Sequence, residues 1–245
     1  MLRMNCKMEK HYIKLLFSSF RTIIIYFLLG CIPLLLTFFK SGTYSIEDRN
    51  IYYLYFDIFS NYIVTLLILP LFALYIENNA YFFDDVKVIV RFKSKLDWWN
   101  KRLAVSAIES LFFTVYTNLL VYFYIVLNGK FKDIDFEFVV FNLKNSLLHF
   151  LGYLVAIMCF VIIVNKFKRI YIGVLIILFI FFIDFVFFIC GFDFTFILYK
   201  MFIYSSYTED VNINFFVASS AAYLCMVFLV LNFLGYKIIK NSDLI

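Results

Sequence analysis

Glycine and proline are scarce in this chain, which has 245 residues but only seven glycines and two prolines. No glycine belongs to a GxxxxGK sequence. A P-loop needs that pattern, because its closely spaced glycines let backbone N–H groups surround a nucleotide's phosphates. The sequence therefore excludes a P-loop ATPase site in this chain.

Residues that usually carry catalysis or bind metals are also few. The five cysteines form no CxxC pair, and the histidines, His11 and His149, have no HExxH spacing. Neither GxSxG nor a GxGD-like pair of aspartates occurs. The cysteines are expected to act as small apolar residues rather than as a disulfide framework or zinc site. We therefore predict no catalytic residue, no metal ligand and no bound cofactor, and the chain is not expected to be an enzyme.

Charge is low as well: 16% of residues are charged, whereas 64% are hydrophobic and 23% are aromatic. A soluble domain carries about 25% charged residues. The excess of apolar side chains is expected to face a lipid bilayer, and no nucleic-acid partner is expected. A bias toward Phe, Tyr, Ile, Asn and Lys is typical of low-GC bacteria.

Six segments have the length and apolarity of transmembrane helices, which need about 20 residues to cross the hydrocarbon core. Strands are excluded, because the alternating ten-residue pattern of a membrane barrel is missing. The chain is thus predicted to be an all-α polytopic membrane protein with one domain, 1–245. The spans are 22–39, 58–76, 103–127, 147–164, 170–190 and 215–236.

The N-terminal arm is basic and leads into the first apolar segment, as in a signal peptide. No small-x-small cleavage site follows, so this segment is predicted to be retained as a span. Apolar residues recur at helical spacing over 10–24. This pattern predicts an amphipathic N-terminal helix, which either anchors the terminus at the membrane or bends into the first span.

Basic residues alternate from one side of the predicted spans to the other. The N-terminal arm, the second and fourth loops and the C-terminal tail hold 16 Lys and Arg, and the other three loops hold 6. Short cytoplasmic loops carry the excess of Lys and Arg in membrane proteins. Both termini are therefore predicted to be cytoplasmic, in a multi-pass protein of the bacterial plasma membrane.

The second loop, residues 77–102, is longer than a simple connection requires. Ser94-Lys95-Leu96-Asp97 resembles a capping box, which favours a helix break at Ser94 and a new helix from Lys95 into the third span. A short helix would then cover about 80–91, with Asn78 or Asn79 as its cap. The alternative is one continuous helix from about Asp85. In the plainest interpretation this loop only sets topology, with Trp98 and Trp99 in the interfacial aromatic belt.

The six spans, the amphipathic N-terminus and the long first cytoplasmic loop together resemble the ABC-2 type permeases, the membrane subunits of bacterial ABC exporters. The resemblance covers the whole chain. A shorter likeness, of moderate specificity, joins Val90-Arg91-Phe92-Lys93-Ser94-Lys95 and Trp98-Trp99 to small Gram-positive permeases, some of which serve bacteriocin or lantibiotic export and immunity.

This resemblance implies an ABC ATPase partner that binds ATP and Mg²⁺, and assembly as a homodimer or with a sister permease. It implies a coupling helix in loop 77–102 that docks on the ATPase. It also implies short re-entrant helices in the outer connection 191–214, for which a plain aromatic loop is the alternative. The implied ATPase-coupling residues are Asp84, Asp85, Lys87, Arg91, Ser94 and Lys95.

Two acids, Glu109 and Asp184, lie inside predicted spans, where a charge costs at least about 2.5 kcal/mol at the centre of the membrane. Glu109 is in reach of Arg102 or Arg21, and Asp184 is placed to reach outer water or a central cavity. Each has either a structural role in assembly or a role in a transport path. His149 is expected at the outer interface.

The preferred function is a permease subunit that exports a hydrophobic or amphipathic substrate, such as an antimicrobial peptide. The alternative is a membrane immunity or sensor protein that binds a peptide or partner membrane protein without transport. A third hypothesis, an intramembrane enzyme, would require Glu109, Asp184 and His149 to converge.

Overall fold

The computed structural model describes residues 19–40, 50–83, 92, 94–190, 196–202 and 212–241. This part of the chain is helical and contains no strand. Its six longest helical segments are long and apolar enough to cross a membrane, which confirms the predicted fold class. The helical segments are α2 (Phe20–Lys40), α3 (Ile51–Ile58), α4 (Asn61–Ile63), η2 (Val64–Ile68), α5 (Leu69–Phe83), α7 (Lys95–Leu127), η3 (Phe131–Asp133), α8 (Phe136–Phe167), α9 (Ile170–Ile189), α10 (Leu198–Met201) and α12 (Ile213–Asn241).

The third and fourth spans are longer than their apolar segments. Helix α7 has 33 residues and α8 has 32, so each is about 50 Å long, compared with about 30 Å for a hydrocarbon core. Capping residues set where they begin. Ser94 Oγ accepts a hydrogen bond from the Asp97 N–H, and Asp135 Oδ1 accepts one from the Phe138 N–H. Helix α8 therefore begins about three turns before residue 147, where the fourth span is predicted to start.

The second span is not one regular helix. It begins with α3, which Asn50 caps, and the chain breaks at Phe59 and Ser60 before α4. Val64–Ile68 then forms a π-helix, η2, and leads into α5. In a π-helix each N–H bonds to the carbonyl five residues earlier, which makes the turn one residue wider than in an α-helix. The predicted span 58–76 therefore captures only the part of this segment after the break.

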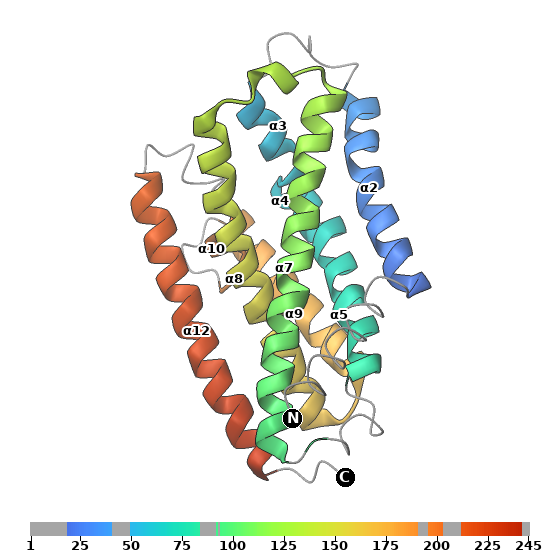
Figure 1. Ribbon diagram of the computed structural model, residues 1–245, viewed down its shortest axis with the longest axis vertical. Helices are drawn as coiled ribbons and strands as arrows, with labels where there is room; N and C mark the ends of the chain where they lie inside the picture. Colours follow the sequence, from blue (N-terminus) through green and yellow to red (C-terminus); the bar gives the residue numbers. More distant parts are fainter. Residues whose placement is uncertain are drawn as a thin grey trace, which may run out of the picture.

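Helix α8 lies at the centre of the bundle, between α7 and α12 in Figure 1. In its most apolar window 72% of residues are buried, compared with 17% for α12 and 28% for both α2 and α9. The outer faces of these three helices carry large exposed apolar side chains, including Phe27, Phe179 and Phe233. In a bilayer such faces contact lipid or other membrane helices.

The helix order places the two groups of basic residues at opposite ends of the bundle. α5 ends, α7 begins and α12 ends in the lower part of Figure 1, whereas η3 and the turn from α7 to α8 lie at the top. Lys95 and Lys101 therefore lie at the end opposite to Lys130 and Lys132. Which end is cytoplasmic stays a prediction from the charge difference.

Candidate functional site: the start of α7 and its contacts

The break predicted at Ser94 is confirmed. Ser94 has extended backbone angles and caps α7, with 3.1 Å between its Oγ and the backbone nitrogen of Asp97. Its side chain and that of Lys95 are exposed at the tip of the helix. The other predicted coupling residues, Asp84, Asp85, Lys87 and Arg91, lie outside the described residues, as does most of the predicted helix at 80–91.

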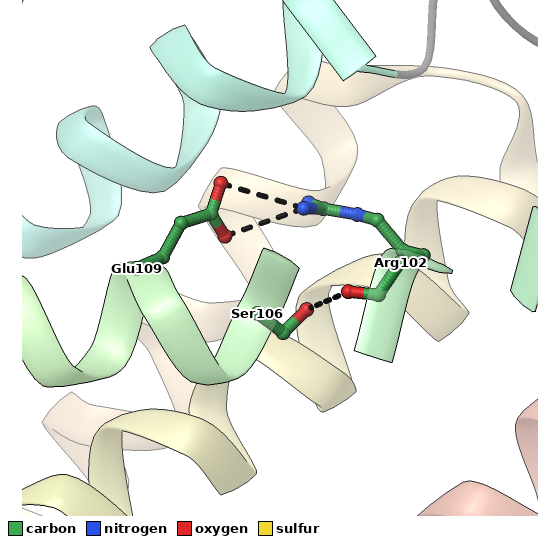
Figure 2. A network of polar contacts seen from close by, with 3 residues as sticks. All are labelled: Arg102, Ser106 and Glu109. Atoms are coloured by element: carbon green, nitrogen blue, oxygen red, sulfur yellow. Dashed lines mark hydrogen bonds and ion pairs between the residues drawn. The ribbon is translucent and has the colours of Figure 1, made fainter. Parts of the chain in front are cut away.

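A buried ion pair lies two turns into α7 (Figure 2). Arg102 Nη1 lies 3.4 and 3.3 Å from the two carboxylate oxygens of Glu109, and both side chains have 0% exposure. The spacing of seven residues places both on one face of the helix. Between them, Ser106 Oγ donates to the Arg102 carbonyl oxygen over 2.8 Å. The pairing predicted for Glu109 with Arg102 is confirmed, and Arg21 is instead exposed.

The two tryptophans of this segment are core residues, with exposures of 1% for Trp98 and 2% for Trp99. Trp99 Nε1 donates to Asn232 Oδ1 of α12 over 2.8 Å. A Cβ atom at Gly235 would lie 2.3 Å from the Trp99 ring, so only glycine permits this close packing. Both rings therefore pack inside the protein, and Trp99 connects α7 to α12.

Asn78 and Asn79 are buried inside α5 and do not cap a new helix, because α5 continues to Phe83. Asn78 Nδ2 donates to Thr22 Oγ1 over 2.9 Å and to Ser19 Oγ over 3.1 Å. These bonds connect α5 to the beginning of α2. The prediction of a cap failed because an Asn near an expected helix end can equally serve contacts between helices.

Asp184 holds the segment that leads into α10. Its carboxylate accepts hydrogen bonds from the backbone N–H groups of Phe196, Ile197 and Leu198, the last two over 2.6 and 2.9 Å. Asp184 is 2% exposed, so its carboxylate lies inside the protein rather than at its surface. Its negative charge also lies at the start of a helix, where N–H groups are free to donate. These bonds favour the structural role among the two that the sequence leaves open for Asp184.

The described part of the outer connection, 196–202, is buried among the spans. Ile197 and Met201 have no exposure, and a Cβ at Gly152 would lie only 2.0 Å from Met201 Cγ. Gly152 is the seventeenth residue of α8, so α10 reaches about halfway along that helix. Figure 1 likewise places α10 well below the upper helix ends. This favours the re-entrant alternative for these seven residues.

His149 is fully buried, which corrects its expected place at the interface. Its ring contacts Phe59 and Phe202, with centroids 4.5 and 4.7 Å away. Glu109, Asp184 and His149 thus have separate neighbours: an arginine, the start of α10 and aromatic rings. These contacts give no support to the convergence that an intramembrane enzyme needs.

The sequence contained a signal for some contacts that were missed. Arg102, Ser106 and Glu109 are polar residues at helical spacing in an apolar segment, which indicates one shared buried face. Asn232 and Asn78 are single polar residues in apolar spans, and a single residue does not identify its partner. Comparison with protein-family models, curated proteins and solved structures finds no match.

Proposed function

We propose that the chain is the membrane-spanning permease subunit of an ATP-driven exporter of the ABC-2 type, as its sequence resemblance implies. A separate ATPase would bind ATP and Mg²⁺ and contact loop 77–102. The substrate would be hydrophobic or amphipathic, and the permease would act as a homodimer or with a sister subunit in the bacterial plasma membrane.

One observation carries this proposal: the helices on both sides of loop 77–102 are fixed to the bundle by buried polar contacts. On the α5 side, Asn78 bonds Thr22 of α2. On the α7 side, Trp99 bonds Asn232 of α12, and Arg102 pairs with Glu109. A loop that served only to connect two spans would not require such bonds to other helices.

Through these contacts, a displacement of loop 77–102 would be transmitted to other helices of the bundle. Because Asn78 and Trp99 bond to α2 and α12, a partner that moved the ends of α5 and α7 would also act on these two outer helices. Helix α7 continues without a break to Leu127, near the opposite end of the bundle. ATP-driven movement of a docked ATPase could in this way change the packing of the spans.

The outer faces of the bundle suit both lipid and a second permease. Large apolar side chains are exposed along α12, including Phe215, Met226, Leu229, Val230 and Phe233. Without a hydrophobic driving force in lipid, helices associate by close packing and hydrogen bonds. A central path between two permeases would then be lined by such lightly buried helices.

The proposal is tested by affinity purification of the full chain from its native membranes, with any protein that carries a Walker motif identified by mass spectrometry. The variant Arg91→Glu/Lys95→Glu reverses two charges of the docking segment. Loss of desolvated charge pairs costs about 2 kcal/mol or more, so recovery of the ATPase should fall more than about tenfold. The charge-matched control is Lys130→Glu/Lys132→Glu at the opposite end, which should leave recovery unchanged.

Equal recovery with both double variants would contradict docking through this loop. Wild-type protein that recovers no ATPase would contradict the exporter itself and favour the alternative, an immunity or sensor protein. Substrate export by reconstituted vesicles supplies the functional measurement. It should require ATP and should be lost with Arg91→Glu/Lys95→Glu.

A further inference from the structure

Three uncharged polar residues lie on one face of α8, inside the bundle. Asn142, Asn145 and His149 are 4%, 0% and 0% exposed. Their spacing of three and four residues keeps them within one stripe of the helix. His149 comes thirteen residues after α8 begins at Phe136, about 20 Å along the axis. The stripe therefore runs from one end of α8 toward its middle.

Helix α7 adds polar residues at the same levels. Ser110 Oγ donates to the Phe150 carbonyl oxygen over 2.6 Å, which fixes the register of the antiparallel helices α7 and α8. Counting away from this bond places Asn118 level with Asn142 and Thr114 between the levels of Asn145 and His149. Asn118 and Thr114 are 7% and 2% exposed. The two helices thus present polar side chains to the same interior region.

Aromatic residues in α3, directly after α3 and directly after α10 enclose this region. Tyr55 of α3 packs against Phe141, with ring centroids 5.1 Å apart, and is 2% exposed. Phe59 and Phe202 cover the His149 ring. We call Tyr55, Thr114, Asn118, Asn142, Asn145 and His149 the polar seam.

Many polar atoms of the seam make no hydrogen bond with the described residues. These atoms are Tyr55 Oη, Thr114 Oγ1, Asn118 Oδ1, Asn142 Oδ1, both amide atoms of Asn145 and both ring nitrogens of His149. A buried polar atom without a partner loses its hydration and gains nothing in return. Eight such atoms would offset a large part of the small net stability of a folded protein. A hydrogen-bonding molecule within the seam would remove this cost.

The chemistry of the seam specifies that molecule. The seam contains no Asp, Glu, Lys or Arg, so nothing in it balances a charged guest. Its hydroxyls, Asn amide and imidazole offer both donors and acceptors. The guest must therefore be uncharged, small enough for a packed interior, and able both to donate and to accept. Water meets these conditions, since buried waters usually make about three bonds to otherwise unsatisfied polar groups.

We propose that the polar seam is an internal water-binding site, which extends between α7 and α8 from the level of Asn142 to His149. The bound water would extend over about 10 Å along α8. It would lie next to the aromatic rings that enclose the seam. The site is independent of the exporter function, and an immunity or sensor protein with this fold would contain it too.

The test is hydroxyl-radical labelling by a short X-ray pulse on the full chain in lipid nanodiscs, read by mass spectrometry. Radicals form at bound water, so a buried tyrosine beside water is labelled although it has no exposure. Tyr75 is the matched control, because it is fully buried on α5, outside the seam. Tyr55 should be labelled about tenfold faster than Tyr75, given water within bonding distance of its hydroxyl. Equal rates at Tyr55 and Tyr75 would overturn the proposal.

Variants then assign the labelling to the seam. Asn145→Leu/His149→Phe removes four of the unpartnered atoms and should lower labelling of Tyr55 to the rate of Tyr75. Should this variant not fold, the conservative His149→Gln, which keeps a donor and an acceptor, should retain fast labelling.

Native mass spectrometry distinguishes water from another small molecule as the occupant of the polar seam. A retained small molecule, together with protection of Tyr55, would mean that the occupant is not water and would also overturn the proposal.

Discussion

Trp99 on α7 donates its indole N–H to the side-chain oxygen of Asn232 on α12, 133 residues later in the chain. The same ring packs against Gly235, one turn further along α12. This contact joins the second turn of α7 to the least buried of the six spans. It therefore holds the cytoplasmic ends predicted for α7 and α12 together.

Replacing Trp99 by Phe should separate the hydrogen bond from the ring packing. Side-chain hydrogen bonds between membrane helices contribute about 0.6 kcal/mol on average and up to about 1.7. A cycle of Trp99→Phe, Asn232→Leu and the double variant should give a coupling energy of about 1 kcal/mol in unfolding titrations with a denaturing detergent. No coupling would mean that the bond does not connect the helices energetically.

Gly235→Ala should destabilise the bundle by about 1–3 kcal/mol, because the new Cβ overlaps the Trp99 ring and forces it to move. Gly30→Ala is the matched control: its Cβ would have the Tyr116 hydroxyl oxygen, 3.3 Å away, as its nearest neighbour. Thermal unfolding in detergent measures the loss of stability in Gly235→Ala and in Gly30→Ala. Equal losses would show that the close approach at Gly235 is not the cause.

The Arg102–Glu109 pair should be far more costly to break than to replace. Glu109→Gln or Arg102→Met alone removes one charge of the pair while the other stays buried, and should cost about 3–5 kcal/mol. The double variant Arg102→Met/Glu109→Gln removes both charges. Its unfolding midpoint should therefore be higher than that of either single variant. The measurement is again the unfolding midpoint. A double variant less stable than both single ones would indicate further essential contacts of these groups.

Packing between Gly152 and Met201 should control the position of α10. Gly152→Ala places a Cβ 2.0 Å from Met201 Cγ and should displace α10 from α8. Met201→Ala should cost about 2–5 kcal/mol by itself, and Gly152→Ala should cost little in that background because the space is then free. Protease cleavage of the 191–214 connection reports the displacement. Equal cleavage of wild type and Gly152→Ala would exclude it.

Asp184→Asn should loosen the same segment without changing its shape. Hydrogen bonds to a charged group contribute about 1.5–3 kcal/mol, and an amide offers one acceptor oxygen for the three N–H groups now bound. The segment should then be cleaved faster than in wild type. Asp133→Asn is the control, because that carboxylate is half exposed and pairs with Lys130 at the surface. Faster cleavage in both variants would exclude a specific role for Asp184.

The sequence predicts the architecture well, because long apolar segments follow directly from the thickness of a bilayer. Ser94 was also predictable, since a cap and its partner lie three residues apart on one stretch of chain. Local sequence patterns did not predict where the helix of the fourth span begins. Asn142, Lys144 and Asn145 make the first turns of α8 polar, and hydropathy alone placed them in a loop.

Contacts between distant segments could not be predicted in this way. Nothing near Asp184 shows that it binds the backbone of residues 196–198, and nothing near Trp99 points to Asn232. Burial of His149 depends on Phe59 and Phe202, which come from a broken span and a re-entrant segment. Such partners are set by how the helices pack, and many packings satisfy the same apolar pattern.

The π-helical segment at Val64–Ile68 also determines what α5 presents to its neighbours. Its wider turn accommodates one residue more than an α-helical turn, and each residue of an α-helix turns the following side chains by about 100°. Deleting a single residue there would rotate Leu69–Phe83 and turn Asn78 away from Thr22. The alignment of the second span with the first thus depends on the length of a five-residue segment about three turns away from that bond.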